Sequence, residues 1–396
     1  MKKSDKIQLA SIDQCTGCSA CASICPTKSI TMIEDKEGFL QPHIDTDSCI
    51  QCHKCEKTCP IISPIAIPTD FETQAYAAIN KDEAVRMRSS SGGMFHALAK
   101  WTIEKGGVVF GAAFEGIHLN HQYAETLDEA QRFMGSKYIQ SDVANSYRDV
   151  KNFLEGGSWV LYSGTPCQIA GLKKYLGREY DKLLTVDLIC YGVPSPAIWE
   201  KYIKRKLKQL KAKDIYNISF RHNTDYRLSF DFINYKHIRG QFDEDSIRND
   251  YYAFFTRRIF RVSCYLCQFR SIGASHSDFT IGDCWNAPKD HENMVDGKGI
   301  STIVIQTNSA YNTFEQIKNG FELDKEDLSI LQHRYEHMLH RGLLERKIIP
   351  WRISNILAQY VPLEYLRFVY MHDRINIIVK RRFKKIVDKY RYVYDR

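Results

Sequence analysis

The chain has 396 residues, and at about 100–200 residues per domain this length predicts two or three domains. Hydrophobic residues make up 44% and charged residues 26%, as in globular proteins. The sequence has neither the run of about 20 apolar residues that spans a bilayer nor a secretory signal, so we expect a cytoplasmic protein. The formal charge of +8 counts every thiol as neutral. Iron-bound thiolates would cancel much of it, so we expect no nucleic-acid binding.

The first 66 residues form a cysteine-rich module with an internal repeat. The motif C-x2-C-x2-C-x3-C-P occurs at 15–26 and again at 49–60. Such motifs bind 4Fe–4S clusters in two-cluster ferredoxins, and the fourth cysteine of each motif ligates the other cluster. The expected ligands of the first cluster are Cys15, Cys18, Cys21 and Cys59. Those of the second cluster are Cys25, Cys49, Cys52 and Cys55. A zinc module is the alternative, but zinc sites usually take their ligands as two separated pairs.

A mixed α/β domain is predicted to follow the module, in which a short hairpin turns at Glu37-Gly38. Seven segments rich in β-branched and aromatic residues are predicted strands: 106–114, 159–164, 183–189, 215–221, 227–235, 277–283 and 301–307. Three segments with helical apolar spacing are predicted helices: 96–105, 168–177 and 197–211. This alternation favours a parallel or mixed sheet covered by helices, with 215–235 as an antiparallel hairpin. Residues 310–396 are expected to be mostly helical.

Five cysteines lie outside the module, and four of them could hold a third cluster. Cys167 and Cys190 each follow a predicted buried strand, and neighbouring parallel strands would bring them together at one edge of the sheet. Cys264 and Cys267 form a C-x2-C pair that would complete a set of four thiolates. Two alternatives stay open. Cys167 and Cys190 could be buried structural thiols, or Cys284 could replace one of the four.

Two polar loops that contain glycine are candidate cofactor contacts. The first loop comprises Ser89, Ser90, Ser91, Gly92 and Gly93. It precedes a predicted helix, whose exposed amides could bind phosphate, although a plain helix cap is the simpler interpretation. The second loop comprises Gly135, Ser136, Lys137 and Tyr138. The sequence has no G-x-G-x-x-G after a strand and no P-loop motif, so a standard dinucleotide or P-loop site is not supported.

Six motifs, in this order along the chain, resemble one known family. They are RSSSGG at 88–93, GSKY at 135–138, GTPCQIAGL at 164–172, VDLICYGVPSP at 186–196, CYLCQFR at 264–270 and SDFTIGDCW at 277–285. Together they resemble the beta-subunit family of coenzyme F420 hydrogenase/dehydrogenase. That family includes the beta subunits of F420-reducing hydrogenase and formate dehydrogenase, and the plant 7-hydroxymethyl chlorophyll a reductase.

The resemblance implies an α+β fold in which a two-cluster ferredoxin-like module precedes a mixed α/β catalytic domain and a helical C-terminus. The implied parts are a ferredoxin-type domain at 1–66, the family's N-terminal domain at 70–155, its C-terminal domain at 156–310 and a helical extension at 311–396. Members of the family are FAD-dependent iron–sulfur oxidoreductases, which pass electrons from clusters to a flavin that exchanges a hydride with a second molecule.

The resemblance also implies roles for particular residues. By motif, the ligands of a third 4Fe–4S cluster are Cys167, Cys190, Cys264 and Cys267, and Cys284 is not among them. The loops Ser89–Gly93 and Gly135–Tyr138 correspond to segments that contact FAD. The expected partners are a ferredoxin-like donor or a partner subunit, and a small-molecule hydride acceptor.

The acceptor and the mode of action stay open at this point. The acceptor is F420 or another small molecule, since proteins of this arrangement resemble members found beside polysaccharide biosynthesis genes in organisms without F420. A non-catalytic electron-transfer subunit is the main alternative function, and an iron–sulfur redox sensor is a further one. The basic amphipathic segment 375–396 is expected to be a solvated terminal helix rather than a helix on a membrane surface.

Overall fold

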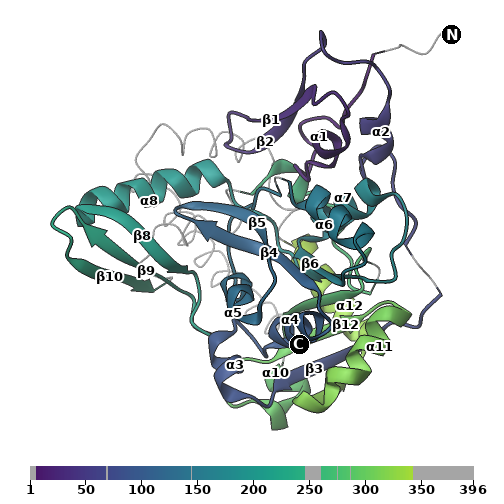
Figure 1. Ribbon diagram of the computed structural model, residues 1–396. Coiled ribbons are helices and arrows are strands. Elements are labelled where there is room, and N and C mark those ends of the chain that lie inside the picture. Colours follow the sequence, from purple (N-terminus) through teal and green to yellow (C-terminus); the bar gives the residue numbers. More distant parts are fainter. Residues whose placement is uncertain are drawn as a thin grey trace, which may run out of the picture.

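The computed structural model describes residues 6–67, 70–143, 145–245, 260–273, 275–285 and 287–341 (Figure 1). These residues form a small N-terminal module, a large mixed sheet covered by helices, and a second, smaller sheet. Among them, no helix has the length and apolar character needed to cross a membrane. The predicted terminal helix at 375–396 lies outside the described residues.

The N-terminal module repeats its local backbone structure as its sequence repeats. Its elements are α1 (Ala20–Ile24), β1 (Ile30–Glu34), β2 (Leu40–Ile44) and α2 (Lys54–Thr58). The residues that begin the two helices, Ser19 and His53, have left-handed φ angles of 60° and 56°. β1 and β2 pair antiparallel, and Gly38 takes the positive φ of 81° that their turn requires. The predicted hairpin is therefore confirmed.

Eight strands form the large sheet. In spatial order they are β13 (Phe321–Glu326), β3 (Gln74–Asn80), β12 (Ser301–Ile305), β11 (Phe279–Asp283), β7 (Leu183–Leu188), β6 (Val160–Gly164), β4 (Val108–Glu115) and β5 (His118–Ala124). The central strands β11, β7, β6 and β4 are parallel, and the remaining pairs are antiparallel. The predicted mixed sheet is confirmed, and the carboxyl ends of the four parallel strands lie at one edge.

Helices cover both faces of this sheet. The longer ones are α4 (Met94–Glu104), α6 (Ser146–Glu155), α7 (Pro166–Leu176), α11 (Asn308–Ile317) and α12 (Leu328–Arg341). The short ones are α3 (Glu83–Arg88), α5 (Leu127–Ala130), α10 (Ala287–Asp290) and the 3-10 turns η1 (Gln131–Phe133), η2 (Val262–Cys264), η3 (Glu292–Met294) and η4 (Lys318–Gly320). Alternate strand residues face opposite layers. Val109 and Leu184 pack with α4 and α11, while Phe110 and Tyr162 pack with α6 and α7.

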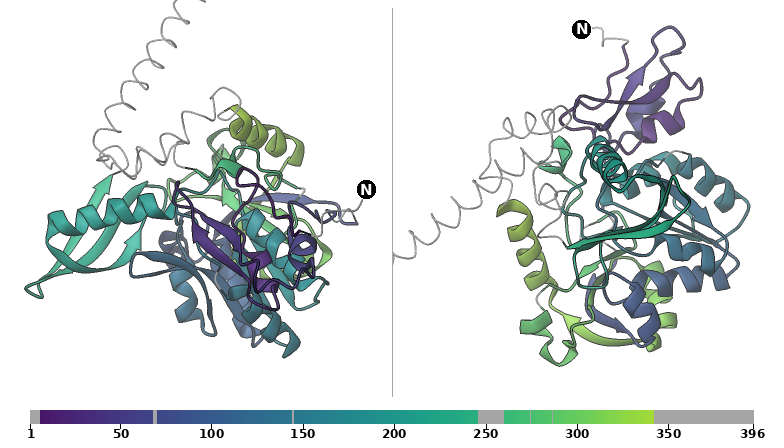
Figure 2. Two further views of the ribbon diagram at one scale, coloured as in Figure 1. Left: turned by 90° about the horizontal axis from the view of Figure 1, so that it is seen from above. Right: turned by 90° about the vertical axis from the view of Figure 1, so that its left-hand side faces the viewer.

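A second sheet projects from this body (Figure 2). It contains β8 (Ala212–Ser219), β9 (Arg227–Asn234) and β10 (Arg239–Asp245), and helix α8 (Pro196–Leu210) lies against it. β8 and β9 pair antiparallel, so the predicted hairpin is confirmed. Trp199 of α8 is buried among the aromatic residues of this sheet, and its indole N–H donates to the Ile117 carbonyl at 2.8 Å. The hydrogen bond ties α8 to the large domain.

The sequence did not predict β3, β5, β10 and β13, and three of these lie at sheet edges. β13 falls in the region expected to be helical, where it separates α11 from α12. Its sequence FELDKE carries charged residues at four of six positions, because an edge strand exposes much of its surface. Short strands of this composition lack the apolar, β-branched signal on which strand prediction depends.

Candidate functional site

The first group of module cysteines draws its members from both motifs: Cys15, Cys18, Cys21 and Cys59. Burial, together with the neighbouring Cys15 and Cys59 thiols, raises the pKa of Cys18 to about 12. Burial also raises the pKa of Cys21, with contributions from Cys18, Cys15 and Cys59. Cys59, the last cysteine of the second motif, therefore lies with the first three cysteines of the first motif.

The second group lines a single small cavity of the module: Cys25, Cys49, Cys52 and Cys55. The rest of the lining includes Pro26, Ile30, Ile44 and Ile50. Burial raises the pKa of the Cys55 thiol to about 11. Here Cys25, the last cysteine of the first motif, joins three cysteines of the second motif. The two groups thus exchange their fourth members, which is the arrangement that two cubane clusters require.

The third group lies at the carboxyl edge of the large sheet: Cys167, Cys190, Cys264 and Cys267. Cys167 is in the first turn of α7, directly after β6, and Cys190 follows β7, the parallel neighbour of β6. Burial raises the pKa of the Cys167 thiol well above its usual value, and the Cys267, Cys190 and Cys264 thiols add to this shift. All four thiols are therefore within electrostatic reach of one another.

Local sequence fixes the position of Cys167 within this group. Thr165 and Gln168 form a capping box at the start of α7, in which the Thr165 N–H donates to Gln168 Oε1 at 2.9 Å. Pro166 occupies the first helical position, where its missing N–H costs nothing. The Thr165 hydroxyl lies 3.2 Å from Cys167 Sγ. The residues of the GTPCQ motif that begin the helix therefore also fix the position of the Cys167 thiol.

The electrostatic environment of the third group fits a cationic iron–sulfur core. Burial raises the pKa of Cys190 to about 12 and that of Cys264 to about 11, so these thiols stay protonated unless a positive charge offsets the burial. A metal supplies such a charge and ionises the thiols that it binds. Arg270 acts in the same direction, because its charge lowers the pKa of both Cys190 and Cys264.

Helix α7 connects the first cysteine group to the third. A Cβ on Gly171 would lie 2.9 Å from Cys18 Cβ and 3.0 Å from Cys18 Sγ, so only glycine allows this close approach. Gly171 stands one helical turn after Cys167. The Tyr147 hydroxyl donates to the Gln168 carbonyl at 2.8 Å. Burial raises the pKa of Tyr147, and the Cys18 and Cys167 thiols both add to this shift. Tyr147 therefore lies between the two groups.

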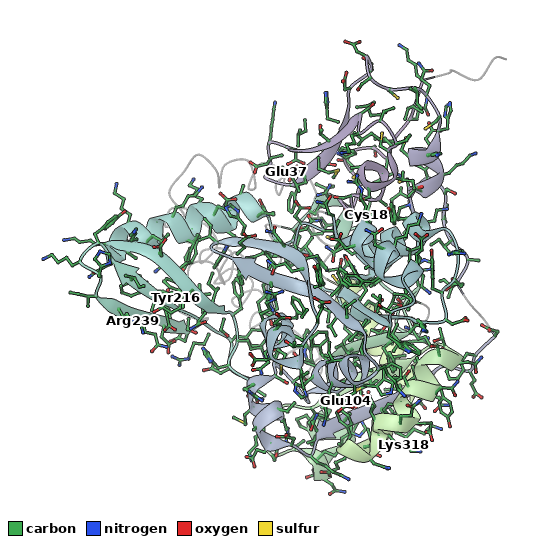
Figure 3. The ribbon with its side chains drawn as sticks, viewed as in Figure 1. Cys18, Glu37, Glu104, Tyr216, Arg239 and Lys318 are labelled. Atoms are coloured by element: carbon green, nitrogen blue, oxygen red, sulfur yellow. The ribbon has the colours of Figure 1, made fainter. Side chains whose placement is uncertain are left out.

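A buried arginine holds the module against the large domain at the same boundary. Arg261 is 1% exposed, and its guanidinium donates to the Cys15 carbonyl at 2.7 Å and to the Leu40 carbonyl at 2.9 Å. It also donates to Gln140 Oε1 at 3.2 Å. Figure 3 labels Cys18 and Glu37, two module residues at this boundary. No motif marked Arg261 in the sequence, whereas a glycine inside a predicted helix was a usable signal for Gly171.

The two polar loops meet, although they are far apart in the sequence. The Ser136 N–H donates to Ser90 Oγ at 2.7 Å. The first loop also contacts the start of β12, because the Gly92 N–H donates to Ser301 Oγ at 2.8 Å and Ser91 Oγ donates to the Ile300 carbonyl at 2.7 Å. Ser301 pairs with Ala78 at the end of β3, so these contacts lie at the edge that also holds Cys190.

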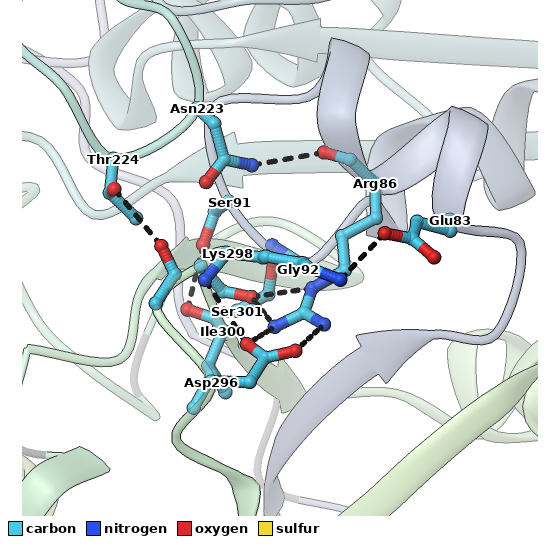
Figure 4. A network of polar contacts seen from close by, with 12 residues as sticks. Glu83, Arg86, Ser91, Gly92, Asn223, Thr224, Asp296, Lys298, Ile300 and Ser301 are labelled. Carbon is cyan, nitrogen blue, oxygen red and sulfur yellow. Dashed lines mark hydrogen bonds and ion pairs between the residues drawn. The ribbon is translucent and has the colours of Figure 1, made fainter.

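Most polar groups of these loops serve the fold. A network of hydrogen bonds and ion pairs holds the first loop (Figure 4). In it Arg86 pairs with both oxygens of Asp296 at 2.7 and 2.6 Å and donates to the Gly299 carbonyl. In the second loop, the Lys137 ammonium donates to three carbonyls at 2.9–3.2 Å. Burial lowers the pKa of Lys137 to about 7, but these three carbonyls favour its charged form.

A cationic and aromatic patch adjoins the second loop. Tyr138 stacks on Tyr226 with ring centroids 6.0 Å apart, and the Arg221 guanidinium lies 4.8 Å from the centre of the Tyr226 ring. Arg221 pairs with Asp283 at 2.5 Å, at the end of β11. Its Nε is buried and has no hydrogen-bond partner among the described residues. The patch therefore offers an unsatisfied cationic donor beside two aromatic rings.

Cys284 lies apart from the three cysteine groups. Its thiol donates to Glu326 Oε1 at 3.5 Å, and its closest polar neighbours also include His291. The Cys284 side chain packs in a separate apolar cluster with Ala77, Ile79, Ala287, Met294 and Ile300, which contains no cysteine of the third group. Of the alternatives left open by the sequence, replacement of one of the four cysteines by Cys284 is therefore not supported.

Comparisons with known proteins add family and domain matches. Residues 157–329 match the family described as the C terminus of the coenzyme F420 hydrogenase/dehydrogenase beta subunit, and residues 14–61 match the 4Fe-4S dicluster domain. An uncharacterized polyferredoxin-like protein of Methanocaldococcus jannaschii is 35% identical over 57 residues, which are 12% of this chain and 34% of that relative. The chain thus spans about a third of the relative's length. A chain of the F420-reducing NiFe hydrogenase complex from Methanosarcina barkeri superposes with a TM-score of 0.44 at 15% identity, covering 70% of this chain and 93% of that one.

Proposed function

We propose that this chain, whose 4Fe–4S dicluster domain precedes a domain of the coenzyme F420 hydrogenase/dehydrogenase beta-subunit family, is an iron–sulfur flavoprotein oxidoreductase. Its substrates are a one-electron donor, either a ferredoxin-like protein or a partner subunit, and a small molecule that accepts a hydride. When bound, three 4Fe–4S clusters would supply one-electron transfer, and FAD would supply the exchange between single electrons and a hydride.

One observation carries the proposal: the cysteine groups form a continuous series. Each of the first two groups takes its fourth cysteine from the other motif, and Cys18 of the first group packs against Gly171 of α7. The rise of about 1.5 Å per residue puts Gly171 about 6 Å along the helix from Cys167 of the third group. A protein that only stored clusters would not need this close approach between a ferredoxin module and a second cysteine group.

The protein's own residues would keep this path short and dry. Arg261 fixes the module against the large domain through the Cys15 and Leu40 carbonyls. Tyr147 is fully buried between Cys18 and Cys167 and excludes water there. Exclusion of water and fixed hydrogen bonds near the sulfurs are the means by which a protein sets the potential of a cluster.

The position of the two polar loops supports flavin as the second cofactor. They meet at the carboxyl edge of the parallel strands, where ligands bind in open α/β sheets. Helix α4 begins directly after Gly93 and points its free amides toward this edge, as an anionic group requires. The unpaired Arg221 Nε and the stacked Tyr138 and Tyr226 rings provide a cation and flat apolar surface nearby.

Metal and flavin analysis of the anaerobically purified chain tests the proposal. Three clusters require about twelve iron atoms, and we expect one FAD with them. The variant Cys264→Ala/Cys267→Ala should lose about four iron atoms, while the control Cys284→Ala should keep them all. Unchanged iron in the double variant would refute the third cluster. A preparation with all its iron but no bound flavin, even after addition of FAD, would refute the flavin enzyme.

That second result would instead favour an electron-transfer subunit without its own hydride chemistry. The observation that speaks for this alternative is the use of loop polar groups within the fold. Ser91 bonds Ile300, and Lys137 bonds three carbonyls. If FAD is bound, stopped-flow mixing of the reduced chain with F420, NAD(P) and nucleotide sugars would identify the acceptor, and oxidation by none of them would count against a hydride-transferring enzyme.

A further inference from the structure

A buried group of three unlike side chains lies outside the proposed redox path. Cys284 directly follows β11, His291 lies between α10 and η3, and Glu326 ends β13. One atom of each side chain, a thiol sulfur, an imidazole nitrogen and a carboxylate oxygen, lies within 4.8 Å of the others. All three residues are buried, with exposed fractions of 8% for Cys284, 6% for His291 and 7% for Glu326.

The separations between these atoms match a zinc coordination sphere. Cys284 Sγ lies 3.5 Å from Glu326 Oε1, and His291 Nε2 lies 3.6 Å from the same oxygen. Zinc binds thiolate at about 2.3 Å, imidazole at about 2.0–2.1 Å and carboxylate at about 2.0–2.2 Å; at tetrahedral angles its ligand atoms are therefore about 3.3–3.6 Å apart. The two measured separations fall within or at the end of this range.

Hydrogen bonding within the group leaves atoms free for a metal. Glu326 Oε2 is buried and has no hydrogen-bond partner among the described residues, which is costly for a carboxylate. His291 Nδ1 lies 2.7 Å from Asp324 Oδ2, so the ring proton belongs on Nδ1 and the Nε2 lone pair faces Glu326 and Cys284. A carboxylate that orients a histidine in this way is the usual second contact of a zinc ligand.

We propose that Cys284, His291 and Glu326 bind one Zn²⁺ ion, with water as the fourth ligand. The mixed sulfur, nitrogen and oxygen set suits zinc, whereas Mg²⁺ and Ca²⁺ take oxygen ligands. The ion would join the end of β11, the 287–294 segment and the end of β13. Because Asp283 precedes Cys284 and pairs with Arg221, the site would also stabilise the edge that carries the polar loops. The proposal does not depend on the presence of flavin or of a third cluster.

The test is metal analysis of the full chain purified anaerobically without chelators, followed by X-ray absorption at the zinc edge. We expect about one zinc per chain in addition to the iron. The zinc spectrum should show one sulfur at about 2.3 Å and nitrogen or oxygen at about 2.0–2.1 Å. A spectrum with four sulfurs would mean that zinc occupies a cysteine group of an iron site, and it would overturn the proposal, as would a chain free of zinc after incubation with Zn²⁺.

Variants assign the ligands. Glu326→Gln and His291→Gln should each lose most of the zinc and keep the iron. The matched control is Glu322→Gln, which changes an exposed carboxylate on the same strand and should retain both metals. Zinc that persists at one per chain in both ligand variants would refute the assignment. If a variant fails to fold, the zinc-edge spectrum of the wild-type chain still tests the ligand set and can still refute the proposal.

Discussion

Replacement of Arg261 should loosen the ferredoxin module from the large domain. Arg261 is a buried charged group that donates to the Cys15 carbonyl of the module at 2.7 Å and to the Leu40 carbonyl at 2.9 Å, and it also donates to Gln140 Oε1 at 3.2 Å. The substitution Arg261→Met keeps most of the aliphatic length and removes every donor. The two carbonyls then lose their charged hydrogen-bond partner, whose own side chain is buried at this boundary.

The expected loss follows from these contacts. A hydrogen bond to a charged group contributes about 1.5–3 kcal/mol, so the two short bonds to the carbonyls represent about 3–6 kcal/mol. The substitution also removes the unfavourable desolvation of the buried guanidinium charge, and this gain offsets part of the loss. We expect a net loss of about 3 kcal/mol for docking, which is roughly a hundredfold change in the docking equilibrium at 1.4 kcal/mol per tenfold.

Amide hydrogen exchange of the anaerobic protein, followed by mass spectrometry, measures this change. Peptides that cover 15–18 and 37–42 should exchange roughly a hundredfold faster in Arg261→Met, with less effect in Arg261→Lys. Arg132→Met is the control, because Arg132 is exposed and donates to a single carbonyl, that of Tyr123. Protection that is equal in wild type and Arg261→Met would show that other contacts dock the module, and the reasoning would fail.

Three further predictions concern the cysteine groups and the sheet edge. Gly171→Ala should destabilise the chain by about 1–3 kcal/mol through its clash with Cys18, more than the helix gains, and slow electron transfer out of the module. Combining Cys59→Ser with Cys18→Ser should cost no more iron than either change alone, whereas combining it with Cys49→Ser should cost a second cluster. Burial raises the pKa of Asp187 from 3.8 to about 6, so the folded protein binds the Asp187 proton more tightly than the unfolded chain does. The free energy of unfolding should therefore fall by about 1 kcal/mol from pH 5 to 7, and Asp187→Asn should abolish this fall.

Each of these has a direct check. Gly320→Ala is the control for the first, since a Cβ there meets no atom within 4 Å, and equal denaturation midpoints for both alanine variants would contradict the packing argument. For the second, the reverse result, in which Cys59→Ser/Cys49→Ser loses one cluster and Cys59→Ser/Cys18→Ser loses two, would place Cys59 with the other group. For the third, denaturation curves that keep the same pH slope in Asp187→Asn would assign the slope to other groups.

The sequence predicted those features that depend on local spacing. Both cysteine motifs, the hairpin around Glu37-Gly38 and the central strands are encoded within short windows of residues, and the structure contains them. The proximity of Cys167 to Cys190 was also predictable, because each follows a buried strand and β6 and β7 are neighbours. The resemblance to the F420 hydrogenase/dehydrogenase beta subunits is confirmed by the match over 157–329.

Long-range contacts were not predictable in the same way. Arg261 and Cys15 are separated by most of the chain, and neither residue type nor local pattern announces their hydrogen bond. The group of Cys284, His291 and Glu326 is similar, since the Glu326 carboxylate comes within 3.5 Å of the Cys284 thiol from β13, a strand that was itself not predicted. Because this edge strand was not predicted from the sequence, the candidate metal site could not be predicted either.

The position of Gly171 explains why the GTPCQIAGL segment of α7 includes a residue that the position of Cys167 does not require. A thiolate at the start of a helix needs only the capping residues Thr165, Pro166 and Gln168 to be aimed at the sheet edge. The glycine one turn later costs about 1 kcal/mol of helix propensity relative to alanine. That cost is offset only if the ferredoxin module approaches the helix at this turn, where Cys18 in fact lies. The GTPCQIAGL segment therefore serves two cysteine groups, one through its cap and one through its glycine, and this dual role is the strongest physical reason to regard them as one electron path.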